Sequence, residues 1–282
     1  MNDAQSHRTE VSDTEQTHVF GIPLHTAIAG GTVLSFLLLW EIIARLAFAQ
    51  LKIVFPTLVQ ITAALVELLT TGEFYYHLAV TIQEVAISFV LAAIIGITVG
   101  TVLGSNEFLA EAVEPLIYYF STIPKIVLYP LFLVALGVGF ESKIAMGFFS
   151  AIFPITVNMI TGARSVRENY VKVAQVYEAT SREIFEHVYL PSTITHVING
   201  LRLGIGVAII GVLLGELAVS QAGLGNRIKF YFSNLQIEKM YAILLIIFGA
   251  SFALNIGLLK LQQYLWAKGY GAGESEGDAV GF

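Results

Sequence analysis

Long apolar segments run along the chain and are separated by shorter polar stretches. A helix needs about 20 apolar residues to cross the hydrocarbon core of a bilayer. It also satisfies its own backbone hydrogen bonds, which water cannot do at that depth. The pattern therefore predicts an all-α integral membrane protein with about six transmembrane helices. The expected spans cover residues 26–49, 80–104, 112–137, 142–163, 197–219 and 240–266, and an amphipathic piece, Leu58–Leu69, precedes the second span.

Three prolines interrupt the third apolar segment, at positions 115, 124 and 130. Proline lacks a backbone N–H and tends to kink or break a helix. Because Pro124 and Pro130 lie so close together, we expect a bent or broken span. Broken backbone at membrane depth is tolerated where protein covers it or where it lines a cavity. The segment is therefore a candidate for lining a pathway, and a kinked helix packed for shape alone is an equally open reading.

A charged stretch, residues 164–191, separates the fourth apolar segment from the fifth. The bilayer interior does not hold such a stretch, so we expect it in water at a membrane face. Its pattern predicts two short helices, Asn169–Thr180 and a second one that Ser181 caps and Pro191 ends. Helices that rest on lipid carry Lys and Arg on their polar face, whereas this stretch mixes acidic and basic residues. Docking of a soluble partner is therefore favoured over resting on lipid.

The composition agrees with a protein in contact with the lipid bilayer. Of the 282 residues, 56% are hydrophobic and 13% are charged, against about 25% charged in soluble domains. The absence of cysteine excludes disulfides and thiol chemistry, and the net charge of −6 argues against nucleic acid as a partner. We expect polar disordered tails over residues 1–20 and 269–282 around a transmembrane domain over residues 21–268.

Lysine and arginine set the expected orientation, because cytoplasmic loops are enriched in both. Placing the N-terminus in the cytoplasm puts seven of these residues inside and five outside. This weak preference favours a multi-pass protein of the cell membrane with residues 164–191 in the cytoplasm. The inside set is Arg8, Arg164, Arg167, Lys172, Arg182, Lys260 and Lys268, and the outside set is Lys52, Lys143, Arg227, Lys229 and Lys239.

Charged residues within the expected spans are candidates for function, because burying a charge in the bilayer is costly. Glu41 and Arg45 lie four residues apart and are expected to form a structural pair. Arg202 is expected to reach the cytoplasmic face, whereas Glu216 lies near the outer end of the same span. For Glu216 an outer gate and a plain interfacial anchor both stay open. Lys125 either offers its charge to an anion or reaches the lipid headgroups, and the second reading is favoured.

A series of short motifs follows in order along roughly residues 35–225. They are WE at 40–41, TGEF at 71–74, IPKIVLYPLF at 123–132, LGVGFESK at 136–143, FFSAIFPITVNMITGARSV at 148–166, IFEHVYLP at 184–191, NGLRLGIGVA at 199–208, GE at 215–216 and GLG at 223–225. In this order and spacing the chain resembles the membrane subunit of ABC importers, in particular the sulfonate, taurine and nitrate branch of these permeases.

The resemblance implies a type I ABC importer permease (MetI-like) fold. In that fold residues 164–191 would be the EAA loop, whose helices insert into a cleft of a cytoplasmic ATPase. The matching coupling positions are Lys172, Val173, Ala174, Glu178, Ala179, Phe185, Leu190 and Pro191. The match around Arg202 implies that this residue also ties the loop to the fifth span. Candidate pathway or gating residues are Pro124, Lys125, Pro130, Arg202 and Glu216.

The chain departs from the family pattern at four positions, one of which is Val173 in place of the first Ala of the loop signature. Lys172 and Glu178 stand where the family has Glu and Gly, and Glu84 stands where Arg is usual. A glycine at position 178 would permit a left-handed turn, whereas any other residue in that conformation costs roughly 1–2 kcal/mol.

The expected function is the permease subunit of an ATP-driven importer for a small solute such as a sulfonate, taurine or nitrate. Expected partners are cytoplasmic ATPase subunits, an extracytoplasmic substrate-binding protein and a second copy of the permease. The sequence lacks a Gly-rich phosphate loop, so we expect no enzyme activity and no bound cofactor, with ATP acting through the partner. A secondary carrier driven by an ion gradient is the alternative, disfavoured because no internal repeat is evident. An intramembrane enzyme is the least favoured reading.

Overall fold

The computed structural model describes residues 18–19, 22–46, 54–166 and 168–267. These divide into two compact units, one ending at Gln60 and the other beginning at Ile61. Residues 1–17 of the first predicted tail, and the whole of the second at 269–282, lie outside the described residues. Two residues of the first predicted tail form strand β1 (His18–Val19), which pairs antiparallel with β2 (Ile22–Pro23).

The first unit contains one long apolar helix, α1 (Leu24–Leu46). The predicted ion pair on this helix is confirmed, since Arg45 Nε donates to Glu41 Oε1 at 2.7 Å. The other oxygen of Glu41 accepts a hydrogen bond at 2.9 Å from the backbone N–H of Leu58, where α3 (Leu58–Leu69) begins. The first N–H groups of a helix have no partner within it. Glu41 therefore also caps the helix that follows.

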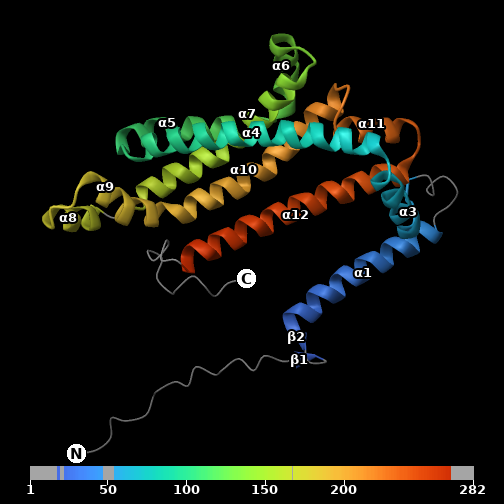
Figure 1. Ribbon diagram of the computed structural model, residues 1–282, viewed down its shortest axis with the longest axis horizontal. Coiled ribbons are helices and arrows are strands. Elements are labelled where there is room, and N and C mark those ends of the chain that lie inside the picture. Colours follow the sequence, from blue (N-terminus) through green and yellow to red (C-terminus); the bar gives the residue numbers. More distant parts are fainter. Residues whose placement is uncertain (1–17, 20–21, 47–53, 167, 268–282) are drawn as a thin grey trace, which may run out of the picture. The chain divides into compact units, whose positions relative to one another are not determined.

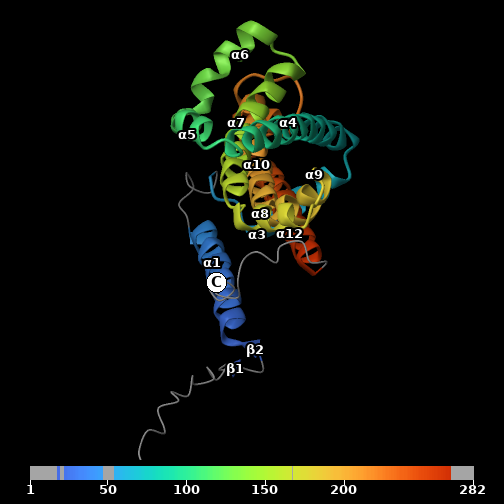
Figure 2. The same ribbon diagram turned by 90° about the vertical axis from the view of Figure 1, so that its left-hand side faces the viewer.

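The second unit is a bundle of long helices joined by short ones (Figures 1 and 2). α7 packs along both α4 and α10, α4 also contacts α10, and α12 packs on α10. The long helices are α4 (Gly72–Gly104), α7 (Phe140–Arg164), α10 (Leu190–Ala218) and α12 (Ile237–Ala267). The short ones are α5 (Glu107–Thr122), α6 (Tyr129–Leu136), α8 (Glu168–Val176), α9 (Ser181–Ile184) and α11 (Leu224–Ser233).

The predicted all-α fold with about six spans is confirmed. Among the described residues, five helices are long and apolar enough to cross a membrane, and the bent pair of α5 and α6 would make a sixth. Below, the end of the second unit where α7 leads through α8 and α9 to α10 is called the loop end. The end where α6 leads to α7 and α10 leads to α11 is called the junction end.

The third expected span is broken, as its prolines predict. α5 and the helical stretch that follows it meet at an angle of 86°. Ile123 and Pro124 are extended, and a 3₁₀ turn, Lys125–Leu128, leads into α6. Proline forces the residue before it out of the helical region, which explains the break after Thr122. Pro130 lies in the first turn of α6, where a missing N–H costs nothing.

Glycine lets the bundle helices approach closely. On α4, Gly96, Gly100 and Gly104 recur every fourth residue and all face α7. A Cβ atom added at Gly100 would lie 2.5 Å from Met159 Cβ and 2.7 Å from the backbone oxygen of Thr156. The van der Waals packing of membrane helices depends on such close backbone contact, because lipid offers no hydrophobic force between them.

Replacing Gly100 with alanine is expected to force α4 away from α7. The free energy of unfolding should fall by about 1–3 kcal/mol, as for other overpacked interiors. Gly249→Ala on α12 is the matched control, because a Cβ there meets no atom within 4 Å. It should leave stability unchanged or raise it slightly, since alanine is the better helix former. Equal unfolding midpoints for both variants in detergent would contradict the close approach.

Candidate functional site

The charged stretch forms a small helical projection at the loop end. α8 and α9 lie beyond the adjacent ends of α7 and α10 (Figure 1), joined by a turn at residues 177–180. In this turn Glu178 adopts a left-handed backbone with φ of 57°. Its backbone N–H donates to the backbone oxygen of Gln175 at 3.0 Å. The next N–H, that of Ala179, donates to the backbone oxygen of Ala174, also at 3.0 Å. These two bonds define a Schellman motif, the usual end of a helix before a glycine.

The left-handed turn that the family builds with glycine is therefore present here with glutamate. A side chain in this conformation costs roughly 1–2 kcal/mol, which the two carbonyl-capping bonds and the next helix offset. The departure at Glu178 changes the side chain that the turn presents, and the backbone still makes a left-handed turn there.

The helix after the turn is capped by Thr180 and not, as predicted, by Ser181. The backbone N–H of Thr180 donates to Glu183 Oε2 at 2.7 Å, and the Glu183 N–H donates to Thr180 Oγ1 at 3.3 Å. This reciprocal pair is a capping box, with the spacing Thr-x-x-Glu. The Thr180 N–H stabilises the ionised carboxylate and so holds the pKa of Glu183 below its usual value.

Pro191 does not end the second helix, and this prediction was wrong. α9 continues through a π-helical segment, Phe185–Tyr189, directly into α10, which begins at Leu190. Pro191 lies in the first turn of α10, where proline is well tolerated. The fifth span therefore begins earlier than predicted and is continuous with the projection. The side chains of Phe185 and Leu190 lie outside the described residues.

The other predicted coupling residues lie on the projection with different exposure. Lys172 and Val173 are exposed on α8, whereas Ala174 and Ala179 are half-buried. Two apolar side chains that were not chosen as coupling residues are more exposed than Val173, which is 54% exposed: Val176 is 81% and Tyr177 is 83% exposed. With Tyr170 and Val173, also exposed, they form what we call the α8 apolar face. Exposed apolar patches mark binding surfaces.

A cavity of about 330 Å³ lies beside the broken segment. Residues 121–126 form one wall, and Ser150 of α7 and three apolar residues of α10 form the rest. Of the predicted pathway residues, Pro124 and Lys125 line this cavity and Pro130 does not. The Lys125 ammonium group donates to the backbone oxygen of Ser121 at 2.7 Å, and it lies 5.9 Å from the ring centre of Phe153. It is the one charged side chain among the described residues that line the cavity.

Arg202 joins two spans. Its Nε donates to Asn255 Oδ1 at 2.9 Å, which ties α10 to α12. The predicted tie between the loop and the fifth span stays a prediction.

Glu216 is fully buried, and its part in an outer gate or in an interfacial anchor stays a prediction. Its Oε1 accepts from Thr81 Oγ1 at 2.7 Å, and its Oε2 accepts from the backbone N–H of Gly225 at 2.6 Å. Glu216 lies in a cluster that we call the polar junction, made of His77, Thr81, Glu84, Lys143, Glu216 and residues 223–225.

The polar junction caps the start of α11. Three successive backbone N–H groups lead into that helix, and each finds an acceptor on a side chain from α4 or α10. The N–H of Gly223 donates to His77 Nδ1 at 3.1 Å and that of Leu224 to Thr81 Oγ1 at 2.8 Å, while Gly225 donates to Glu216. Unpaired N–H groups at a helix start are costly when buried. The junction thus satisfies all three.

Close packing at the junction explains why glycines occur in the GE and GLG motifs. Gly223 has a left-handed φ of 97°, and a Cβ added there would overlap the carboxyl group of Glu216. At Gly225 the added atom would lie 2.6 Å from Glu216 Cβ. At Gly215 it would lie 3.2 Å from the ring of Tyr129 on α6. The motifs therefore mark the place where α6, α10 and α11 meet.

Lys143 is also buried in the junction, at 2% exposure. Its Nζ donates to the oxygen of Gly139 at 2.8 Å and to that of Val138. It thereby closes the turn between α6 and α7. One signal for the junction was present in the sequence, because His77, Thr81, Glu84 and Ser88 follow a helical spacing and form a polar stripe within an apolar span.

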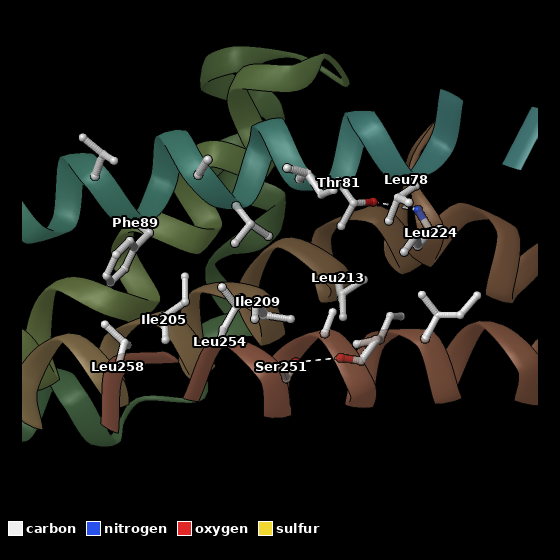
Figure 3. Close-up of a pocket in the computed structure, with 17 residues that line it drawn as sticks. Leu78, Thr81, Phe89, Ile205, Ile209, Leu213, Leu224, Ser251, Leu254 and Leu258 are labelled. Carbon is white, nitrogen blue, oxygen red and sulfur yellow. Dashed lines mark hydrogen bonds between the residues drawn. The ribbon is translucent and has the colours of Figure 1, made fainter. Parts of the chain in front are cut away.

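An apolar pocket of about 340 Å³ lies beside the junction, between α4, α10 and α12 (Figure 3). Thr81 and Leu224 stand at one end of it, and Phe89, Ile205 and Leu258 at the other. Apart from Thr81 and Ser251, every lining side chain is apolar. This pocket suits hydrocarbon and not a polar solute, so the cavity beside Lys125 is the better candidate for polar chemistry.

Comparison with known proteins gives a consistent result. The family of binding-protein-dependent transport system inner membrane components matches residues 92–267. The formylaminopyrimidine transport permease protein ThiX of Halalkalibacterium halodurans is 32% identical over 71% of this chain and 77% of its own. The taurine transport system permease protein TauC of Escherichia coli is 26% identical over 68% of this chain and 70% of its own.

The fold also matches a solved structure. An inward-facing conformation of the MetNI methionine ABC transporter includes a chain that superposes with a TM-score of 0.58. The match covers 70% of this chain and 99% of the other at 16% identity, so the likeness is one of fold.

Gly223→Ala is expected to destabilise the protein more than Gly137→Ala. Both glycines have a left-handed φ, of 97° and 80°, so alanine costs roughly 1–2 kcal/mol at either position. Only at Gly223 would the added Cβ also strike Glu216, because nothing lies within 4 Å at Gly137. Thermal unfolding of the two variants in detergent measures the difference. A lower midpoint for Gly137→Ala would show that the junction does not constrain residue 223.

Proposed function

The chain belongs to the binding-protein-dependent transport system inner membrane component family of ABC importer permeases, and we propose that it couples solute import to a cytoplasmic ATPase through its loop end. The observation that carries this proposal is the projection of α8 and α9 between two membrane-spanning helices, with the α8 apolar face exposed. A lipid-facing surface of this kind would be basic on its polar side. Docking in an apolar cleft of a soluble partner suits it better.

The continuous path from projection to span supports mechanical coupling. The π-helical segment joins α9 to α10 without a break, so a force on the projection acts directly on a helix that lines the cavity beside Lys125. ATP-driven closure of the ATPase subunits would move the projection, and α10 would move with it. This route places residues 164–191 on the cytoplasmic side, with the N-terminus on that side as well.

The cavity beside the broken segment is the part of the translocation pathway that this subunit supplies. Broken backbone at membrane depth occurs where it lines a cavity, and Lys125 gives this one a positive charge. A second copy of the chain would complete the pathway, and a substrate-binding protein at the junction end would deliver a small solute. Relatives are named for taurine and formylaminopyrimidine. ATP would be hydrolysed by the partner subunit, with no cofactor bound to this chain.

Val176→Asp should abolish ATP-dependent uptake. The charge would have to be desolvated in the apolar cleft of the ATPase, which costs several kcal/mol without a partner charge. Gln175→Asp is the matched control, because residue 175 is exposed on α8 outside the apolar face. Uptake by the assembled transporter in proteoliposomes, together with ATPase stimulation, is the measurement. Full uptake by a correctly inserted Val176→Asp variant would overturn the coupling route.

Lys125→Met should lower the uptake rate by about tenfold or more, since a hydrogen bond to a charged group contributes about 1.5–3 kcal/mol. Lys125→Arg keeps the charge and should retain most of the rate. The control is Lys229→Met, because Lys229 is exposed and bonds to the Ala218 oxygen outside the cavity. Taurine and formylaminopyrimidine are the first solutes to try. If Lys125→Met transports like the unmodified protein, the cavity beside Lys125 is not the pathway.

A further inference from the structure

The polar junction contains two buried acidic side chains and one buried basic side chain. Glu84 and Glu216 are 2% and 0% exposed, and Lys143 is 2% exposed. The ammonium group of Lys143 interacts with both carboxyl groups. If both acids were ionised, the cluster would carry one uncompensated negative charge inside a membrane-spanning bundle. Such a charge is expensive to bury.

The two carboxyl groups also interact with each other, since Glu84 lies one turn of α4 beyond Thr81, whose hydroxyl donates to Glu216. An ionised carboxylate accepts hydrogen bonds and cannot donate one. A hydrogen bond between two carboxyl groups therefore requires a proton on one of them, as in other pairs of acids that share a site. With that proton the cluster contains one ammonium, one carboxylate and one neutral acid, and its net charge is zero.

The remaining hydrogen bonds indicate which acid holds the proton. Both oxygens of Glu216 already accept, one from Thr81 and the other from the backbone of Gly225, which suits the anion. Glu84 Oε2 is buried and has no hydrogen-bond partner among the residues that the structure describes. An unpaired oxygen costs far less on a neutral acid than on a carboxylate. Glu84 is thus the donor, and its unpaired oxygen is the carbonyl of the neutral acid.

We propose that Glu84 and Glu216 form a buried proton-binding site, in which Glu84 carries the proton and donates it in a hydrogen bond to ionised Glu216. The site joins α4 to α10 at the point where Glu216 also caps α11. Loss of the proton to external water leaves two carboxylates in contact, and their repulsion opens the junction. The proposal concerns this chain alone and does not depend on the coupling to an ATPase.

Other titratable groups face the site from each element packed on it. They are His77 on α4, Tyr129 on α6, Lys143 and Glu141 on α7, and Arg227 on α11, which pairs with Glu73. His77 Nδ1 accepts from Gly223, so protonating His77 breaks that bond. This effect appears as pH falls, whereas the effect of losing the Glu84 proton appears as pH rises. The two are therefore distinguishable.

Infrared spectroscopy of the full-length protein in lipid nanodiscs tests the site directly. At neutral pH exposed carboxyl groups are ionised, so a carbonyl band of a protonated carboxylic acid reports a buried proton. We expect this band in the unmodified protein and its loss in Glu84→Gln. Glu107→Gln, which removes an exposed carboxylate on α5, should leave it in place. No such band in the unmodified protein, or a band that survives in both Glu84→Gln and Glu216→Gln, would overturn the proposal.

Stability against pH gives the second readout. The folded chain holds a proton that the unfolded chain releases at neutral pH, so the stability contributed by the pair is lost as pH rises. The unfolding midpoint of the unmodified protein should fall on the alkaline side, and that of Glu84→Gln should not, because the amide keeps the donor without titrating. Glu216→Gln should be less stable than Glu84→Gln at neutral pH, since its NH₂ would face the Thr81 or Gly225 donor. If Glu84→Gln were the less stable of the two variants, the proton would belong to Glu216, and its assignment to Glu84 would be wrong.

Discussion

The carboxylate of Glu216 joins parts of the chain that are far apart in sequence. It accepts hydrogen bonds from Thr81 on α4 and from Gly225 at the start of α11, and it interacts with Lys143 on α7. Inside a bilayer no water can serve these groups, so each must find its partner within the protein. Glycine occupies positions 223 and 225 because the side chain of Glu216 leaves no room for a Cβ atom at either position. Most of the packing at the junction end follows from this one side chain.

The loop end differs from the junction end, because several of its side chains are exposed and not buried. A Schellman motif and a capping box fix the two short helices with backbone and local side-chain bonds, so few of their side chains are needed for the fold. That leaves Val176 and Tyr177 exposed for a partner. In the proposed coupling, α10 links the projection at one end to the polar junction at the other and carries movement between them.

Much of the fold could be predicted from the sequence, since long apolar runs predict spans and Pro124 predicts the break. The predictions that failed concern contacts between residues distant in sequence, or a choice between two local structures that the sequence allows equally. Pro191 looked like a terminator, yet a π-helical segment lets the helix begin with it. Ser181 and Thr180 are both capping residues, and only the position of Glu183 distinguishes them. The partners of Glu216 could not be predicted, because a contact with Thr81 across 135 positions leaves no mark in a local pattern.

The central claim is that this permease works only with an ATPase docked on its projection. Solute accumulation in proteoliposomes tests it most directly, with the chain reconstituted alone under a proton or sodium gradient and, separately, with its ATPase subunit and binding protein. The account predicts accumulation in the complete system with ATP, and none with the chain alone under either gradient. Accumulation by the chain alone, driven by a gradient and indifferent to ATP, would contradict it and identify a secondary carrier.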